Sequence, residues 1–160
     1  MPNWCYNTAT LTHKDPAVIQ ELVAVLNLEE PRVFQHLRPL PKAEEDNWYT
    51  WQIQHWGTKW DMRVGDYELL DENTIIVNFD TAWSPPTTLY EFLTENGWEV
   101  DAMYHECGMC FVGRFYDGFD NYKDYNFEDE DWKDGIDEET LEWSGLEYDY
   151  ESWLEEKQDD

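Results

Sequence analysis

Segments in which apolar residues alternate are separated by segments in which they recur at helical spacing, and this order restricts the possible folds. Residues 4–12 alternate in side-chain type and are rich in β-branched and aromatic residues, which favours a strand. Asp15-Pro16 supplies a cap and a proline for the first helical position, and apolar residues follow at helical spacing over 16–26. Residues 62–70 and 74–81 predict two strands joined by a short polar turn. The first half of the chain therefore predicts a strand, a helix and a hairpin.

The following segments add a second helix and two more strands. Ser84-Pro85-Pro86 opens a helix that stops at Asn96-Gly97, and residues 98–106 and 110–116 predict two strands. The order β-α-β-β-α-β with one further strand is typical of an α+β protein with a ferredoxin-like fold. In that fold a split β-α-β antiparallel sheet carries its helices on one face. We expect residues 1–116 to form this domain.

The connection after the first helix carries weaker signals. Residues 27–46 contain three prolines and predict an irregular crossing. Asn47 is placed to cap a short, tryptophan-rich helix that ends at Gly57. We therefore expect one short helix between the crossing and the hairpin.

The charge of the chain indicates what it can bind. It holds 37 acidic and 10 basic residues, a formal net charge of -27. Residues 117–160 alone hold 19 acidic and 3 basic residues, a net charge of -16. Such a charge repels nucleic acid and anionic membranes, so we expect a basic protein as the partner, with no direct nucleic-acid binding and no membrane contact. No apolar run approaches the roughly 20 residues that span a bilayer, and the start lacks a signal-peptide pattern, which predicts a cytoplasmic protein.

The acidic segment is unusually rich in aromatic residues. Acidic tails are disordered when they have too few apolar side chains to offset the entropy of ordering, and this tail does not fit that description. We expect residues 117–160 to form an acidic, partly helical extension whose rings pack on the body or on a partner. Asp137 is placed to cap one helix, and Ser144 begins a capping box for a second, with a break near Gly145. Only residues 155–160 are expected to form a free tail.

Four motifs in the body carry a family resemblance. They are MPNWC at 1–5, HWGTKWD at 55–61, FDTAWSPP at 79–86 and the spacing Tyr104-x-Glu106-x-Gly108-x-x-Phe111-x-Gly113. Together they resemble the YubB-like proteins of plasmids and phages over residues 1–116. The resemblance implies a ferredoxin-like domain in a mobile-element protein that acts in a bacterial cytoplasm. It supplies no catalytic residue, because the family carries no settled activity, and residues 117–160 lie outside the matched motifs.

The cysteines suggest a metal site that we do not favour. Cys107 and Cys110 form a CxxC pair with His105 close by, a combination that zinc sites use. Structural zinc usually has four ligands, and the only other cysteine, Cys5, lies in the first predicted strand. We interpret the pair as hairpin residues with reduced thiols, and we expect no metal and no cofactor.

Two tryptophan-rich loops form a second candidate site. Trp56, Trp60 and Trp83 with Lys59 have the residue types of a binding cleft, since aromatic rings stack bases or sugars well. The other interpretation is that these tryptophans fill the core and bond their indole N–H groups to loop carbonyls, and we favour it. No Ser-His-Asp order, Walker loop or dinucleotide-binding motif occurs, and we expect no catalytic residue and no enzyme activity.

The leading functional hypothesis is imitation of nucleic acid. If residues 137–160 were helical they would span roughly 36 Å and carry about one net negative charge per 3.6 Å. One DNA strand carries a phosphate per about 3.4 Å along the duplex axis. A phage or plasmid protein with this property is expected to inhibit a basic nucleic-acid-binding host defence protein, of restriction or CRISPR type, by occupying its DNA or RNA channel. The predicted contact residues are carboxylates with three tryptophan anchors: Asp129, Glu130, Asp131, Trp132, Asp134, Asp137, Glu138, Glu139, Glu142, Trp143, Glu147, Asp149, Glu151 and Trp153.

Two alternatives remain open at the level of sequence. The first is a small enzyme or ligand-binding domain that uses loops 56–61 and 81–86, with the acidity serving solubility. The second is adaptation to high salt, which predicts poor folding in low salt. Removal of residues 117–160 separates the first from imitation of nucleic acid, because a function centred on the body should survive it.

Overall fold

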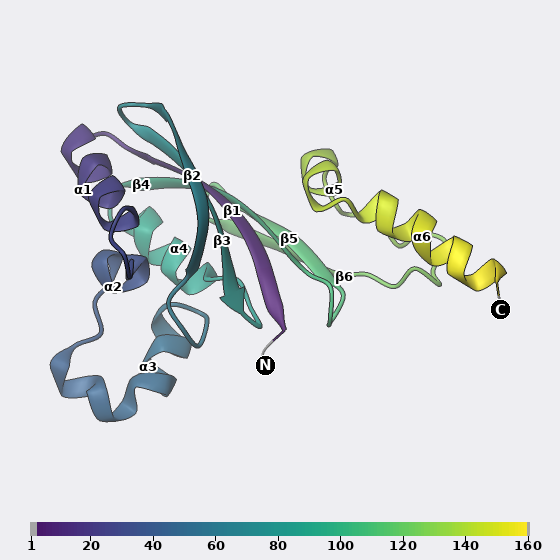
Figure 1. The fold of residues 1–160 in the computed structure, drawn as a ribbon, viewed down its shortest axis with the longest axis horizontal. Coiled ribbons are helices and arrows are strands. Elements are labelled where there is room, and N and C mark those ends of the chain that lie inside the picture. Colours follow the sequence, from purple (N-terminus) through teal and green to yellow (C-terminus); the bar gives the residue numbers. More distant parts are fainter. Residues whose placement is uncertain (1–2, 160) are drawn as a thin grey trace.

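The computed structural model describes residues 3–159 and has an α+β architecture with a six-stranded antiparallel sheet (Figure 1). The order across the sheet is β2-β3-β1-β4-β5-β6. The strands are β1 (Trp4–His13), β2 (Arg63–Asp71), β3 (Thr74–Ala82), β4 (Trp98–Glu106), β5 (Phe111–Tyr116) and β6 (Phe119–Asp124). The five strands predicted from sequence are all present within a residue or two of their expected ends, and β6 is additional.

The central strand β1 indicates which face of the sheet is buried. Ala9 is buried and pairs with Val77 of β3 and Ala102 of β4. Successive side chains of a strand point to opposite faces, so these residues lie on one face, together with Phe115 of β5. All four belong to the main hydrophobic core. This face is therefore the buried side of the body.

Two of the helices that pack on this face were predicted from the sequence. They are α1 (Pro16–Leu26) and α4 (Thr87–Glu95), and both contribute leucines to the main core. Asp15 caps α1 as predicted, because its carboxylate accepts the backbone N–H of Ala17 at 3.0 Å. The expected helices thus lie where the apolar periodicity places them.

The connection between α1 and β2 is more regular than its prolines predict. It contains α2 (Val33–Leu37) and the 3-10 helix η1 (Lys42–Asn47), followed by α3 (Trp48–His55). The predicted cap on α3 is wrong, because the side chain of Asn47 makes no capping hydrogen bond. The predicted end is right, since Gly57 follows with a positive φ of 89°.

A distant carboxylate orders α2. Asp61 accepts the backbone N–H groups of Phe34 at 2.8 Å and Gln35 at 3.0 Å, and also that of Met62. These donors belong to the first turn of α2, where backbone N–H groups have no partner within the helix. The last residue of the motif HWGTKWD is therefore structural.

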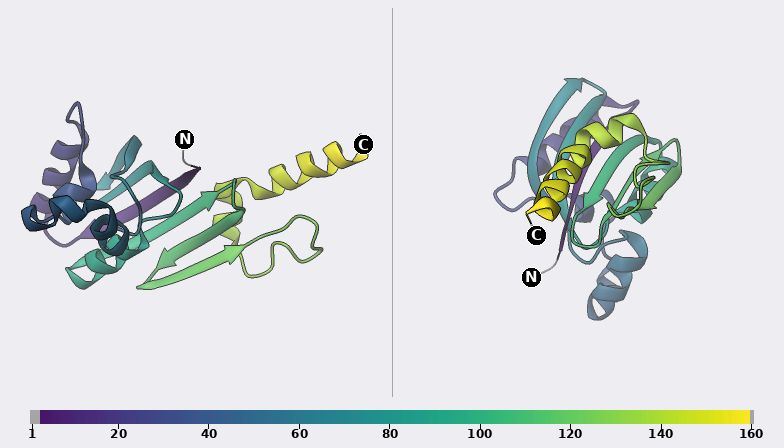
Figure 2. Two further views of the ribbon diagram at one scale, coloured as in Figure 1. Left: turned by 90° about the horizontal axis from the view of Figure 1, so that it is seen from below. Right: turned by 90° about the vertical axis from the view of Figure 1, so that its right-hand side faces the viewer.

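The C-terminal helices lie at the other side of the sheet. They are α5 (Glu138–Ser144) and α6 (Leu146–Gln158), and α5 contacts β4 and β5. Val112 of β5 packs with Leu146, and its position in the strand places it on the face opposite Phe115. Figure 2 shows the loop after β6 and α6 extending together beyond the end of the sheet.

Three features of the extension differ from expectation. Residues 119–124, assigned to the extension from sequence, form β6 and pair with β5 at the edge of the sheet. The side chain of Ser144 does not start a capping box, because Gly145 in a left-handed conformation is the residue before α6. The predicted free tail is wrong for 155–158, which complete α6, while Asp160 lies outside the described residues. Among residues 3–159, no helix is both long and apolar enough to cross a membrane.

Candidate partner-binding site

Residues 125–159, here called the acidic arm, follow β6 and contain α5 and α6. The arm holds 15 acidic and 2 basic residues, a net charge of -13. Its first part, 125–137, is a series of turns, and Asp137 then caps α5 as predicted by accepting the N–H of Thr140 at 2.8 Å. Gly145 breaks the two helices at φ 71°. The arm is therefore an ordered but bent segment.

An aromatic cluster holds the arm together. The rings of Tyr125, Phe127, Trp132, Tyr150 and Trp153 lie in contact, with centroid distances of 5.0 Å between Phe127 and Trp132 and 5.2 Å between Trp132 and Tyr150. The buried part of this cluster includes Val112 of the sheet and Leu146 of α6. Rings from the loop and from α6 thus pack around one strand of the body. This packing explains how so acidic a segment is ordered.

The three tryptophans predicted to anchor a partner have different roles. Trp132 is only 5% exposed, so its ring packs inside the arm and does not face a partner. The prediction that it contacts a partner is corrected for this reason. Trp143 in α5 and Trp153 in α6 are half-buried and keep part of their rings at the surface. Lys157 lies 4.2 Å from the centre of the Trp153 ring.

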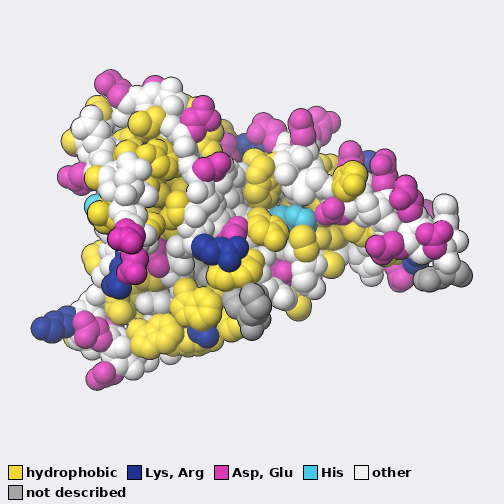
Figure 3. Space-filling view, viewed as in Figure 1, with side chains coloured by type: hydrophobic (Ala, Val, Ile, Leu, Met, Phe, Trp, Pro, Cys, Tyr) yellow, Lys and Arg dark blue, Asp and Glu magenta, His cyan; other side chains and the backbone are white. Residues whose placement is uncertain are grey.

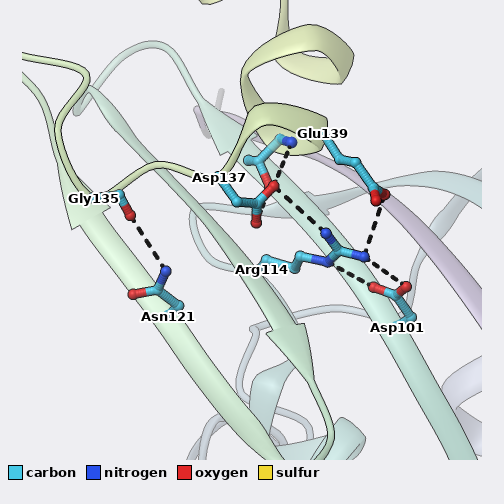
Figure 4. A network of polar contacts seen from close by, with 7 residues as sticks. Asp101, Arg114, Asn121, Gly135, Asp137 and Glu139 are labelled. Atoms are coloured by element: carbon cyan, nitrogen blue, oxygen red, sulfur yellow. Dashed lines mark hydrogen bonds and ion pairs between the residues drawn. The ribbon is translucent and has the colours of Figure 1, made fainter.

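One arginine of the sheet gathers three carboxylates at the base of the arm. Arg114 of β5 donates to both oxygens of Asp101 at 2.9 and 2.8 Å (Figure 4). Its guanidinium also lies 3.5 Å from Asp137 and 3.3 Å from Glu139. The side chain of Arg114 is 18% exposed, so these ion pairs are partly shielded from water. Arg114 therefore fastens the start of α5 to the sheet.

Few of the predicted carboxylates are neutralised within the molecule. Glu147 pairs with Lys133 at 3.2 Å, and Asp137 and Glu139 share Arg114. The other eight have no ion pair within residues 3–159. Asp149 is half-buried, and the other seven are exposed: Asp129, Glu130, Asp131, Asp134, Glu138, Glu142 and Glu151. The structure thus brings the predicted carboxylates together on one ordered arm.

The motif around residues 104–113 serves the structure of the sheet. Glu106 is 1% exposed, and its carboxylate accepts the backbone N–H groups of Gly108 and Met109 in the β4–β5 turn. Gly113 lies directly opposite Tyr104, and a Cβ at Gly113 would fall 2.3 Å from the Tyr104 hydroxyl oxygen. These residues are required by packing and need no role in binding.

The same hairpin holds the CxxC pair. Cys107 Sγ lies 3.7 Å from His105 Nε2, and that nitrogen also lies 2.9 Å from the Tyr125 hydroxyl. Burial lowers the pKa of His105 and raises that of Cys107, so the neutral forms of both groups are favoured. Within residues 3–159, no group of three His, Cys, Asp or Glu side chains is arranged to hold a metal ion. Cys5 is buried in β1.

The two tryptophan-rich loops are tied to each other by side-chain hydrogen bonds. Thr58 donates to the carbonyl of Ala82 at 2.8 Å, and Ser84 donates to that of Gly57 at 2.7 Å. Trp56 is 2% exposed and donates its indole N–H to the Arg38 carbonyl, as the core interpretation predicts. The core interpretation is wrong for Trp60 and Trp83, because both side chains are exposed.

Trp60 and Trp83 are 39% and 44% exposed. Lys59 Nζ lies 4.7 Å from the Trp60 ring, 5.2 Å from the Trp83 ring and 5.4 Å from the Tyr49 ring. Trp83 also has a φ of 67°, an uncommon conformation for a residue other than glycine. Figure 3 shows hydrophobic side chains with basic ones among them at this end of the molecule and acidic side chains along the arm at the other.

Comparison with protein-family models, with curated proteins and with solved structures found no match for this chain. The functions of the acidic arm and of the surface around Trp60, Trp83 and Lys59 are therefore inferred from their own residues.

Proposed function

We propose that the acidic arm imitates the backbone of a nucleic acid and occupies the basic channel of a nucleic-acid-binding protein. The observation that carries this proposal is a set of eight carboxylates that have no ion pair within residues 3–159 and lie on a segment ordered by aromatic packing. A basic channel offers such carboxylates Arg and Lys donors, of which the chain itself has only 10 for its 37 acidic residues. Because the arm is ordered before binding, its side chains lose less conformational entropy than those of a flexible tail.

The charge spacing along the arm suits this role. α6 has 13 residues and carries five acidic side chains, at Glu147, Asp149, Glu151, Glu155 and Glu156. A helix of that length spans about 20 Å, which gives one carboxylate per about 4 Å. The spacing is close to the phosphate separation of about 3.4 Å in one DNA strand. The bend at Gly145 directs α5 differently, so the imitation rests on two short charged helices instead of one long one.

Apolar contacts supplement the charges in this proposal. Trp143 and Trp153 retain surface area on α5 and α6, where they provide the aromatic anchors that protein interfaces use. Tyr148 is 73% exposed on α6 and adds a third ring. Trp132 acts instead as a positioning residue within the arm. No catalytic step and no cofactor are part of this function.

The body supports a mobile-element origin in this proposal. The strand order β2-β3-β1-β4, with α1 and α4 on one face, is the arrangement expected of a ferredoxin-like domain. That fold, with the motifs that resemble YubB-like proteins, favours a phage or plasmid protein acting in the host cytoplasm. The partner class that benefits such an element is a basic host defence protein of restriction or CRISPR type.

A matched pair of charge variants tests the proposal. The arm variant carries Glu130→Gln, Glu138→Gln, Glu142→Gln and Glu151→Gln, and the control carries Glu29→Gln, Glu30→Gln, Glu91→Gln and Glu95→Gln on the body. All eight residues are exposed, and the two variants have the same net charge. Each chain competes with fluorescent duplex DNA for purified restriction enzymes and CRISPR effectors. We expect the arm variant to compete at least tenfold more weakly and the control to match the unmodified chain.

Salt provides a second readout in the same assay. Competition that rests on carboxylates replacing phosphates should weaken steeply between low and physiological salt. Equal loss of competition in both quadruple variants would indicate a general charge effect and would contradict imitation by the arm. Failure of the unmodified chain to displace DNA from any protein in the panel would contradict the proposed target class.

A further inference from the structure

A groove at the end of the molecule opposite the arm has the composition of a ligand site. Its volume is about 330 Å³, within the range of small-molecule pockets. Trp48, Trp56 and Trp60 line it with Leu40, and the polar lining comes from Arg32, Gln35, Gln52 and Asp61. Trp56 and Gln52 are buried, whereas Trp48 and Trp60 are each 39% exposed. The groove thus has a fixed floor and open aromatic walls.

Most polar groups of the groove already have partners in the protein. Gln52 donates to the Lys59 carbonyl, and Gln35 accepts the backbone N–H of Leu40 at 3.1 Å. Asp61, the only carboxylate of the lining, accepts three backbone N–H groups that offset its charge. These contacts hold the floor and walls of the groove in place.

Arg32 differs from them. Its side chain is exposed and has no hydrogen bond or ion pair within residues 3–159, although the chain contains 37 acidic residues. Lys59, whose ammonium lies over the Trp60 ring, likewise has no ion pair in that part of the chain. Arg32 lies close enough to Asp61 for its charge to favour the ionised carboxylate, but the two make no ion pair. The side-chain N–H groups of Arg32 and Lys59 therefore flank the exposed rings of Trp48 and Trp60 without a hydrogen-bond partner within residues 3–159.

We propose that this groove binds a planar aromatic ligand that carries an anionic group, the chemistry of a mononucleotide. The exposed indole rings offer stacking surfaces for a base. Aromatic side chains can stack on any of the bases, because each has a flat π-face. Arg32 supplies a guanidinium for the phosphate, and such pairs are among the stronger hydrogen bonds in proteins. This site is separate from the acidic arm and does not depend on the function proposed for it.

The net charge of the chain favours a free nucleotide over a nucleotide within a single strand as the ligand of the groove. A nucleotide is available free or as part of a single strand, and each further phosphate of a strand adds repulsion from a protein of charge -27. A free mononucleotide brings only its own phosphate group, which Arg32 can bind. We therefore assign the groove to the free ligand.

Titration with AMP, adenosine and a four-nucleotide DNA tests this assignment. The readouts are the tryptophan fluorescence of the protein and isothermal calorimetry in physiological salt. We expect saturable binding of AMP, binding of adenosine at least fivefold weaker, and weaker binding still of the tetranucleotide. Arg32→Gln should reduce AMP binding at least fivefold and leave adenosine binding unchanged.

Matched variants inside and outside the groove test whether the ligand binds in the groove itself. Trp60→Ala and the milder Trp60→Phe should weaken the binding of both AMP and adenosine. Trp83→Ala, which removes a similarly exposed tryptophan outside the groove, should not. Lys14→Gln removes a distant cation as a control for Arg32→Gln. Circular dichroism establishes that each variant is folded. Absence of saturable AMP binding, or equal effects of Arg32→Gln and Lys14→Gln, would overturn the site, and tighter binding of the tetranucleotide would overturn the assignment to a free ligand.

Discussion

Arg114 of β5 lies 3.5 Å from the Asp137 carboxylate oxygen that also caps α5, so one carboxylate ends the turns of the arm and joins the arm to the sheet. Arg114→Leu should therefore loosen the arm while the sheet stays folded. We expect a loss of about 1–3 kcal/mol in unfolding free energy, since charged hydrogen bonds contribute on that scale. Hydrogen exchange should be faster in α5 than in β1 or β3. Arg63→Leu, which removes a more exposed arginine paired with Asp80, is the control and should cost less.

The buried ring of Trp132 is expected to be the main source of order in the arm. Trp132→Ala should cost about 3–5 kcal/mol, the usual range for removing a buried tryptophan. Trp143→Ala, at a half-buried position in α5, should cost clearly less. Urea denaturation followed by tryptophan fluorescence measures both. Equal effects of the two substitutions would contradict the placement of Trp132 within the cluster.

Gly113 is expected to tolerate no side chain. A Cβ there would lie 2.3 Å from the Tyr104 hydroxyl oxygen and 2.7 Å from the Asn121 carbonyl oxygen. Overpacking of this kind costs about 1–3 kcal/mol or more, so Gly113→Ala should lower the melting temperature markedly. Gly145→Ala is a useful comparison, because nothing lies within 4 Å of that Cβ and only the left-handed backbone is penalised. A smaller effect at Gly113 than at Gly145 would contradict the packing described for β4 and β5.

His105 should make stability depend on pH. Burial lowers the pKa of His105 below its ordinary value of 6.5, so the unfolded chain takes up a proton at a higher pH than the folded protein does. Stability should therefore fall as the pH decreases from about 6.5 toward the folded-state pKa. Burial raises the pKa of Asp61 and Asp120, which acts in the opposite sense as pH falls further.

A His105→Gln variant isolates the histidine contribution, since both carboxylates are present in either chain. The difference in unfolding free energy between the unmodified chain and the variant should shrink as pH falls from 7.5 to 5.5. Urea titrations at several pH values measure it. A constant difference over this range would mean that His105 is not held in its neutral form.

The order of strands and helices in the body was predictable because each element carries its own apolar pattern. Residues 4–12 of β1 alternate between buried and more exposed, and α1 has a proline start and a capping aspartate. β6 was not predictable in this way, since five of its six residues are exposed and it joins the sheet through backbone hydrogen bonds to β5. α2 was missed because its ordering carboxylate, Asp61, lies far along the chain.

The candidate sites were predictable only in part for a related reason. Composition alone identified the acidic arm, and its aromatic content indicated that it is ordered. The burial of Trp132 and the exposure of Trp60 depend on which segments meet in space, and tryptophan itself gives no signal of either. Arg114 and Arg32 were missed because a single arginine in sequence does not reveal whether it pairs with three carboxylates, as Arg114 does, or makes no ion pair within residues 3–159, as Arg32 does.

The aromatic cluster contains residues from a strand of the body, a loop and the last helix, so each part is buried only while the others are present. A chain that terminated after Gly145 would keep Trp132 and Tyr125 but lose Leu146, Tyr150 and Trp153, and would leave apolar surface next to the sheet edge. Exposed patches of this kind promote aggregation. Premature termination of synthesis, or proteolytic trimming between α5 and α6, should therefore yield an insoluble product instead of a shorter working protein.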